Sequence, residues 1–350
     1  MISFSPLANR LRKLAGHPPD DIRERAVERW EITPTETVMI PPALFLPGQI
    51  DLIRKTEFAE RDETIAVCIG NRADRLTATR AYRLRDVDLV DGVLHAGGAQ
   101  RYLRIPQRRR PAYLRPARAV SGTLYESWSG NRWFGMWLMT DCLTYQLAET
   151  IGNPMATDWQ LPGNMARFET LLGQAPERIG DVHFDELVLF DDVAPNSGMA
   201  ARAAEMRRRL LHQITPRDVP GVYLLRGRSG DRRLLLNELE IAERLQAELG
   251  FVVLDPLKDS ADEILATCAA TPVLVSVEGS HLANGVAVMP PGSTILTIQP
   301  PDRMTTALKI FTDLRRQRFA FCMAEGGMGE YRADWTLLMR TLDLVDANRK

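Results

Sequence analysis

The second half of the chain alternates short, almost continuously apolar runs with segments of helical periodicity. Runs of this length and composition are typical of parallel strands that are buried on both faces. Strands are expected at 221–227, 251–256, 272–278 and 293–300, and helices at 237–249, 261–270 and 279–289. The pattern therefore predicts an α/β, Rossmann-like parallel sheet with helices on both sides.

Local signals mark the ends of two of these helices. Asn237 stands at the N-cap position of one helix, with Glu240 three residues later and Gly250 at its C-terminal stop. Ser260 and Glu263 have the spacing of a capping box at the start of the next helix.

The first half is less regular. An alternating run at 81–98 is interrupted by Asp91-Gly92, which predicts a β-hairpin. Helical periodicity covers 131–152 and 197–214, and further strands are expected at 64–70, 122–128 and 186–190.

The length of 350 residues suggests two domains, and Pro216 and Pro220 mark a linker between them. We expect an N-terminal arm at 1–30, an N-terminal α/β domain at 31–214, a C-terminal Rossmann-like domain at 215–325 and a C-terminal helix at 326–350. The last segment is amphipathic, and we expect it to cross back to the first domain as a closing helix.

Composition excludes several classes of protein. The net charge of -1 and the lack of aromatic residues among the arginines argue against nucleic-acid binding. The four cysteines are scattered without a CxxC motif, which favours a reducing, cytoplasmic setting. We find no signal-peptide core and no apolar run long enough to span a membrane.

Two basic segments leave a peripheral contact with the inner membrane face open. Leu7, Leu11 and Leu14 alternate with cations near the N-terminus, as in an amphipathic arm or a frayed end. Seven arginines crowd residues 101–118, either as a solvated loop or as a contact for an anionic substrate or lipid headgroups.

A group of cations follows the first strand of the second half. Arg226 and Arg228 leave the strand, and Arg232 and Arg233 precede the helix that starts near Asn237. Arginines beside a helix start at a strand end are suited to phosphates. The alternative is a plain turn at Gly227 and Gly230 with solvated arginines. Neither a Walker A loop nor GxGxxG is present.

A second polar group follows the strand at 272–278. Gly279 and Ser280 open a helix, which is a geometry suited to anions, and Glu278 or His281 could act as a general base. Asn284 could bond a ligand or its own helix. The structural alternatives are a hydrogen-bonded core histidine and a glutamate that pairs with a nearby arginine.

A DxD sequence, Asp86-Val87-Asp88, could bind a metal ion in a sugar transferase. Here it lies in an alternating strand ahead of the hairpin, so we expect both carboxylates to face solvent and predict no metal site.

Residues 80–300 resemble family 61 glycosyltransferases, a group that includes capsular-polysaccharide-type bacterial enzymes. The match is most specific in the C-terminal half and weaker around "RWFGMWLMTDCL". Its positions are Arg226, Arg233, Asn237, Glu238, Gly279, Leu282, Asn284, Pro290, Pro291 and Gly292, with Gly135, Trp137, Leu138 and Asp141 upstream.

The chain departs from the family pattern at two positions. Met136 and Glu278 both replace histidines of the family. The change indicates either a subgroup with a carboxylate base or a non-catalytic nucleotide- or glycan-binding relative, a pseudoenzyme. His281 offers a third choice of base.

The resemblance implies a GT-B-like fold, with two Rossmann-like domains facing a cleft. It implies an inverting, metal-independent hexosyl- or pentosyltransferase without a cofactor. A nucleotide-sugar donor would bind the C-terminal domain, and a glycan or glycolipid acceptor the N-terminal one. A homo-oligomer is compatible with these features.

The residues take separate roles in this hypothesis. Glu278, His281 or Asp141, in that order, would deprotonate the acceptor. Asn237 and Glu238 would shape the loop and cap the helix, and Asn284 would lie near the ligand. The diphosphate would be held by Arg226, Arg228, Arg233, Gly279 and Ser280.

Overall fold

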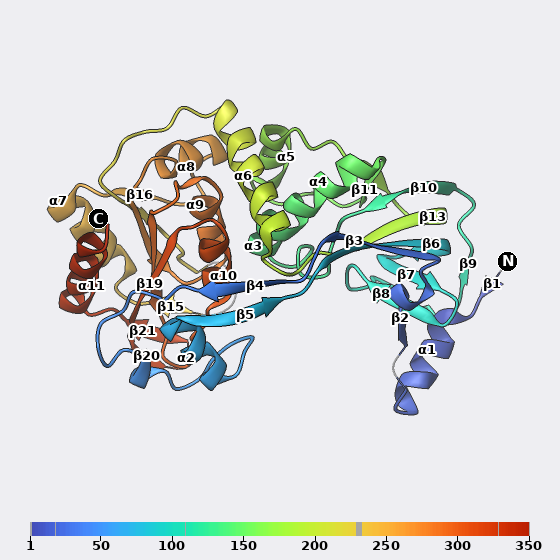
Figure 1. Ribbon diagram of the computed structural model, residues 1–350, viewed down its shortest axis with the longest axis horizontal. Coiled ribbons are helices and arrows are strands. Elements are labelled where there is room, and N and C mark those ends of the chain that lie inside the picture. The colour runs from blue at the N-terminus through green and yellow to red at the C-terminus, as the bar shows by residue number, and fades with distance from the viewer. Residues whose placement is uncertain (1, 18, 109, 229–232, 328, 350) are drawn as a thin grey trace. The chain divides into compact units, whose positions relative to one another are not determined.

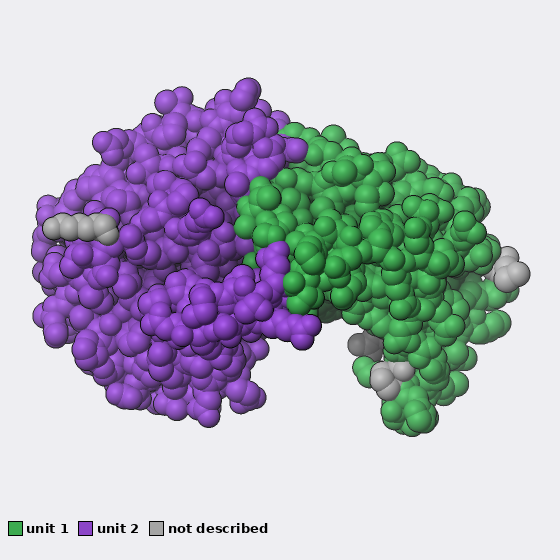
Figure 2. Space-filling model, viewed as in Figure 1, with its two compact units in different colours: residues 1–35, 77–162, 173–202 green, residues 36–76, 163–172, 203–350 purple. Residues whose placement is uncertain are grey.

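A computed structural model describes residues 2–17, 19–108, 110–228, 233–327 and 329–349. Gly230 and Arg232, both part of the predicted phosphate loop, lie outside the described residues. The chain forms two compact units (Figure 2). Unit 1 contains 1–35, 77–162 and 173–202, and unit 2 contains 36–76, 163–172 and 203–350.

Unit 2 is built around a parallel sheet of five strands (Figure 1). The strands are β14 (Val222–Leu224), β16 (Val252–Leu254), β17 (Val273–Val277), β18 (Thr294–Gln299) and β19 (Arg318–Met323). Their order is β16-β14-β17-β18-β19, so the order reverses between β14 and β17. The predicted parallel sheet of the second half is confirmed.

Helices cover both faces of this sheet. The helices are α7 (Glu238–Leu249), α8 (Ala261–Cys268), α9 (Ala283–Val288), α10 (Ala307–Leu314) and α11 (Trp335–Ala347). α7 and α11 share one apolar core with β14, β17, β18 and β19. The right-handed crossovers that contain α8, α9 and α10 place those helices on the other face. The C-terminal helix was expected to cross to the first domain, but Leu338, Leu342 and Val345 of α11 pack on the sheet of unit 2.

The predicted helix ends are only partly correct. Gly250 ends α7 in the left-handed conformation, with φ 69°, and Ser260 accepts the Glu263 N–H at 3.2 Å. Asn237 stands at the predicted N-cap position of α7, but its side chain makes no cap hydrogen bond; its Nδ2 donates to the Ala333 carbonyl at 2.9 Å instead. This bond ties the start of α7 to the segment before α11.

Residues 36–76 belong to unit 2, which differs from the predicted ranges. They form the hairpin of β4 (Glu36–Ile40) and β5 (Arg72–Leu76) and the helix α2 (Arg61–Ile69). Leu44 pairs with Ala320 of β19 and fixes this segment to the sheet edge. The predicted strand at 64–70 is wrong. Short apolar runs fit either element, and the buried residues Thr64 and Cys68 are one helical turn apart.

A buried ion pair holds the same segment. Lys309 of α10 is fully buried, and its ammonium donates to the Pro41 carbonyl at 2.6 Å and to Asp313 at 2.5 Å. The contact joins α10 to the chain beyond β4. Three smaller strands complete the unit as a separate sheet, β15 (Leu234–Leu235), β20 (Glu325–Gly327) and β21 (Glu330–Arg332).

Unit 1 contains a mixed sheet of nine strands. Its main path is β12 (Glu177–Ile179), β11 (Pro154–Thr157), β10 (Ala119–Leu124), β13 (Val182–Asp191), β6 (Thr79–Val90), β7 (Val93–Ala96), β8 (Ala99–Tyr102) and β2 (Asp20–Asp21), and β3 (Glu28–Thr33) also pairs with β6. The first four strands run parallel to one another, β6, β7 and β8 then follow as an antiparallel meander, and β2 pairs with β8 in parallel. The antiparallel meander beyond them corrects the expectation of a Rossmann-like first domain.

The predicted hairpin and helices of the first half are confirmed. Asp91 and Gly92 connect β6 to β7 with φ values of 49° and 74°, as a tight hairpin turn requires. The helical region begins with α3 (Phe134–Met136), continues as a π-helix at Trp137–Asp141 and ends as α4 (Cys142–Ile151). Besides α2, the first 212 residues also contain the α-helices α1 (Ser5–Leu14), α5 (Met165–Leu172) and α6 (Ser197–His212). No helix in the described ranges is long and apolar enough to cross a membrane.

The buried Lys309 gives a first prediction. Replacing Lys309 by methionine leaves the Asp313 carboxyl and the Pro41 carbonyl buried without their cation. We expect the free energy of unfolding to fall by about 3 kcal/mol, the usual effect of breaking a buried pair on one side. Denaturant unfolding measures it. Lys258→Met is the control, since the Lys258 side chain is 80% exposed. Equal stability of both variants would contradict an anchoring role for Lys309.

Candidate functional site

The site lies where the strand order of unit 2 reverses. β16 and β17 lie on opposite sides of β14, so the connections that leave β14 and β17 diverge to opposite faces of the sheet. Such a switch point leaves a crevice at the carboxyl ends of the two strands, which is where doubly wound sheets bind ligands. Arg226 follows β14 and Glu278 follows β17, so both residues lie at this point.

The turn after β14 is fixed by a buried carboxylate. Glu238, the first residue of α7, accepts the Arg226 N–H at 2.7 Å and the Gly227 N–H at 2.8 Å. Burial raises the pKa of Glu238, and the two N–H donors oppose that shift. Glu238 therefore shapes the loop, which leaves the side chains of Arg226 and Arg228 for other contacts.

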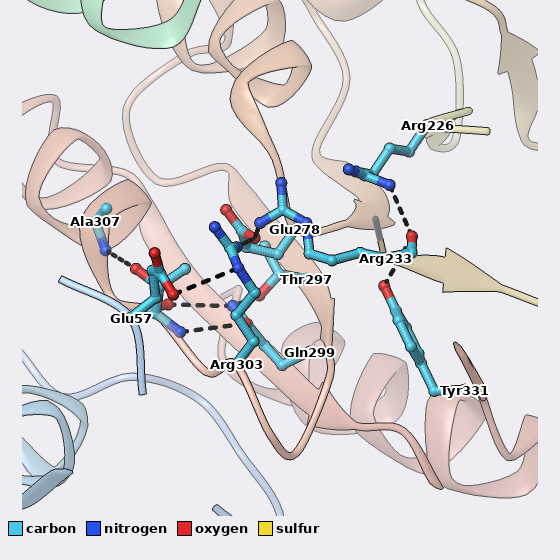
Figure 3. A network of polar contacts seen from close by, with 10 residues as sticks. Glu57, Arg226, Arg233, Glu278, Thr297, Gln299, Arg303, Ala307 and Tyr331 are labelled. Carbon is cyan, nitrogen blue, oxygen red and sulfur yellow. Dashed lines mark hydrogen bonds and ion pairs between the residues drawn. The ribbon is translucent and has the colours of Figure 1, made fainter. Parts of the chain in front are cut away.

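Glu278 is the centre of a cluster of cations (Figure 3). Arg233 forms an ion pair with the Glu278 carboxylate, and both side chains are about nine-tenths buried. Arg303 lies 3.5 Å from the same carboxylate oxygen and also pairs with Glu57 at 3.5 Å. Arg226 donates to the Arg233 carbonyl at 2.7 Å. Two guanidinium groups from different loops thus contact one carboxylate, and that of Arg226 lies beside them, bonded to the backbone of Arg233.

Burial and charge act together on the ionisable groups of this cluster. Burial raises the pKa of Glu278, whereas Arg233 acts to lower it. Burial and the neighbouring charge of Arg233 lower the pKa of Arg226. The carboxylates of Glu57, Glu238 and Glu278 match the three arginines in number, so the cluster offers a ligand guanidinium donors rather than a net positive charge.

His281 is held in one tautomer. The Ser276 hydroxyl donates its only proton to the Leu224 carbonyl, so it must accept from His281 Nε2, at 2.7 Å. The other ring nitrogen, Nδ1, is then an acceptor. Burial and the charges of Arg226 and Arg233 lower the pKa of His281 to about 3. The imidazole is therefore neutral near pH 7.

Gly279 lets the backbone pass close to His281 and Arg226, because it has no side chain. A Cβ at this position would lie 2.9 Å from His281 Nδ1 and 3.4 Å from Arg226 Nε, so only glycine fits without displacing the imidazole. Within the described part of the chain, neither the Gly279 nor the Ser280 N–H has an acceptor. These two donors can bind an anion between the strand and the helix.

Two of the predicted ligand residues have structural partners. Asn284 donates to the His281 carbonyl at 2.7 Å and so bonds its own helix. Asn237 pairs with the Ala333 backbone, as described above. Arg228 is exposed in the turn after β14.

Asp141, the third candidate base, belongs to unit 1. It ends the π-helix and is 2% exposed. Its carboxyl accepts the Ser127 N–H at 3.0 Å and the Ser127 hydroxyl at 2.7 Å. Burial is the main cause that raises the pKa of Asp141 to about 8, with a smaller contribution from the charge of Glu126.

Sequence reasoning missed Arg303 and Glu57. Arg303 follows β18 by four residues, so the rule that singled out Arg226 and Glu278 at strand ends could have found it. Gln299, at the end of β18, fixes this loop by donating to the Thr305 carbonyl at 3.2 Å. Glu57 gave no signal, because its segment joins the site only through tertiary pairing.

The expectation for the DxD sequence was half wrong. Asp86 is exposed, but Asp88 is buried, and it accepts bonds from Tyr113 at 2.9 Å and His183 at 2.8 Å. A buried tyrosine and histidine therefore explain Asp88 as a structural residue. Among the described residues, no group of three or more His, Cys, Asp or Glu side chains could hold a metal ion.

Unit 2 has a doubly wound α/β fold, with a cluster of arginines at its switch point. The sequence profile of the family described as Glycosyltransferase 61 matches residues 30–296, which is well over half of the chain. The chain therefore belongs to glycosyltransferase family 61. No protein with a curated description matches it closely enough to be counted as a relative.

The environment of His281 gives a second prediction. Its folded pKa of about 3 is below the ordinary 6.5, so below pH 6.5 the unfolded chain takes up a proton that the folded site refuses. This contribution to stability is complete above that pH and declines as the pH falls, by about 1.4 kcal/mol per pH unit.

Replacing His281 by glutamine removes the contribution. We expect the free energy of unfolding to depend less steeply on pH in the variant between about pH 6 and pH 4.5. Urea unfolding at several pH values measures the difference, with His17→Gln, at an exposed position, as the matched control. Parallel profiles for wild type and His281→Gln would show that the buried imidazole accepts a proton normally.

Proposed function

We propose that this protein is an inverting glycosyltransferase that moves a sugar from a nucleotide-sugar to a glycan or glycolipid hydroxyl in polysaccharide biosynthesis. Family membership supports sugar transfer, and the site supports the donor class. The observation that carries the proposal is the pairing of Arg233 and Arg303 with Glu278, with Arg226 bonded to the Arg233 carbonyl, at the reversal of strand order.

The donor diphosphate is proposed to bind in unit 2. Arg226 and Arg233 would bind its oxygens, and Arg228 would reach it from the turn after β14. The N–H groups of Gly279 and Ser280, which follow β17, would donate hydrogen bonds to it. Fixed donors of this kind stabilise the charge that develops on a departing diphosphate. We propose that they replace a metal ion and that no cofactor takes part.

Glu278 is the proposed general base. It would take the proton from the acceptor hydroxyl as the oxygen attacks the anomeric carbon on the face opposite the leaving group, which inverts that centre. A buried carboxylate with a raised pKa suits this proton transfer. His281 is a weaker choice because its lowered pKa makes it a poor base, and Asp141 because its carboxyl is enclosed by Ser127.

One observation favours the non-catalytic alternative. Glu278 already forms an ion pair with Arg233, so its carboxylate would compete with a phosphate for the same guanidinium group. In a pseudoenzyme this pair would only hold the nucleotide loop. Wild-type turnover separates the two: the proposed enzyme releases nucleotide from at least one of a panel of UDP-, GDP- and CMP-sugars, whereas a pseudoenzyme binds nucleotide without turnover.

Two substitutions test the assigned roles. In Glu278→Gln we expect turnover to fall by about a hundredfold or more, because the base is lost, while nucleotide affinity stays equal or rises. In Arg233→Gln we expect nucleotide affinity to fall by about tenfold or more, because a charged hydrogen bond is lost. Nucleoside-diphosphate release and calorimetric titration measure the two effects.

Arg217→Gln is the matched control. Arg217 is an exposed arginine that precedes β14, so it belongs to the opposite end of the sheet, and both measurements should be unchanged. Turnover retained in Glu278→Gln would remove Glu278 as the base. An unchanged affinity in Arg233→Gln would contradict the proposed diphosphate site.

Metal removal tests the proposed role of the arginines. We expect turnover to be the same after dialysis against EDTA and after addition of Mg²⁺ or Mn²⁺, because fixed cations supply the charge. Loss of turnover with EDTA and its recovery with one of these ions would contradict a metal-independent mechanism.

A further inference from the structure

Helix α1 exposes its apolar side. Leu7, Leu11 and Leu14 are 39%, 57% and 85% exposed, and Phe4, just before the helix, is 62% exposed. The spacing of three and four residues places these side chains on one stripe of the helix. A stripe of this kind normally faces a protein core.

The opposite side of α1 is the one that docks on unit 1. Asn9 is the buried residue of the helix, and its amide donates to Gln100 Oε1 at 3.0 Å. The Ser5 hydroxyl donates to the Gly97 carbonyl at 3.2 Å, and Arg12 pairs with Asp20 at 3.2 Å.

The helix therefore turns its polar side to the protein and its apolar side to solvent, the opposite of the usual amphipathic surface helix. At 3.6 residues per turn, Ser5, Asn9 and Arg12 lie about half a turn away from the leucine stripe. The polar contacts hold α1 in place against β8 and β2, while the leucines face away from the unit. Because hydrogen bonds fix this orientation, the helix is docked on unit 1 and its leucine stripe is exposed in the docked state.

Other exposed apolar residues extend the same surface. β1 (Ile2–Ser3) pairs with β9 (Tyr113–Leu114), which puts Ile2 opposite Leu114 (Figure 1). These two side chains are 62% and 70% exposed. The Leu7 N–H also donates to the Pro111 carbonyl at 3.0 Å, so α1 lies against the basic segment 101–118.

The two segments that form this surface carry cations only, and the acidic residues beside them, such as Asp20 and Asp91, are already bonded to them. Segments 1–19 and 99–118 contain no Asp or Glu. Arg10, Lys13, Arg108 and Arg110 are exposed there, and Arg10 donates to the Arg110 carbonyl at 3.1 Å. Apolar side chains flanked by cations are complementary to a bilayer surface with anionic headgroups, which accepts both groups at once.

We propose that α1, β1 and β9 form a docking surface for an anionic membrane. Phe4, Leu7, Leu11, Leu14 and Leu114 insert at the headgroup boundary, and the arginines and Lys13 contact the lipid phosphates. Contact is peripheral, because no described helix can span the bilayer. The proposal does not depend on the donor chemistry of unit 2, so either can fail alone.

Vesicle co-sedimentation of the full chain tests the proposal. The vesicles contain either phosphatidylcholine alone or equal parts of phosphatidylcholine and phosphatidylglycerol. We expect binding to the anionic vesicles, weak binding to the neutral ones, and a decrease with rising salt. In Leu11→Glu/Leu14→Glu we expect binding to fall by about tenfold or more, because apolar insertion is lost.

Two variants complete the design. Arg10→Gln/Lys13→Gln should weaken binding to anionic vesicles and leave binding to neutral ones unchanged. Leu239→Glu/Leu257→Glu, at positions 65% and 75% exposed on unit 2, is the matched control and should bind like wild type. Thermal unfolding verifies that each variant folds, and nucleotide affinity should be equal in all of them.

Three results would overturn the proposal. The first is no binding of wild type to either vesicle at low salt. The second is equal binding by wild type and Leu11→Glu/Leu14→Glu. The third is concentration-dependent dimerisation that is lost in Leu11→Glu/Leu14→Glu without any vesicle binding, which would make a second copy of the chain the occupant.

Discussion

The reversal of strand order between β14 and β17 is the constraint on which the candidate site depends. Because the connections after these strands leave on opposite faces, no helix closes the sheet edge between them. The residues that follow the two strands are then brought together without any sequence proximity. Arg226 and Glu278 are 52 positions apart in the numbering and meet in one cluster for this reason.

Charges inside this cluster are tolerated because each is paired. Glu278 has two guanidinium neighbours, and Glu238 accepts two backbone N–H groups. An unpaired carboxylate at either position would be strongly disfavoured by burial. The pairing also explains how Glu278 is buried without disrupting the fold, since Arg233 and Arg303 supply the compensating charge.

The sequence predicted the parts of the structure that local patterns control. Four strands of the parallel sheet, the helices α7, α8 and α9, Gly250, the Ser260–Glu263 pair and the Asp91-Gly92 turn all have signals within a few residues. The helix α10 and the edge strand β19 were not predicted. The predicted roles of Glu278 and the arginines followed from their places at strand ends, and these roles stay proposals.

Features set by tertiary contacts could not be predicted in the same way. The helix at Arg61–Ile69 has an apolar run too short to distinguish it from a strand. The Asn237 side chain does not bond the helix that it precedes, because it forms two hydrogen bonds with the backbone of Ala333. Glu57 reaches the site only because residues 54–57 pair with the loop after β18.

Residues 36–76 also protect the parallel sheet of unit 2 from solvent. They cover Phe319, Phe321 and Met323 on β19 and supply Leu44 to its free edge. A fragment that begins after residue 214 would therefore contain every strand of the parallel sheet but expose one apolar face and one unpaired edge, which together favour aggregation. The compact unit that contains this sheet is discontinuous in sequence, so it cannot be obtained by cutting the chain once.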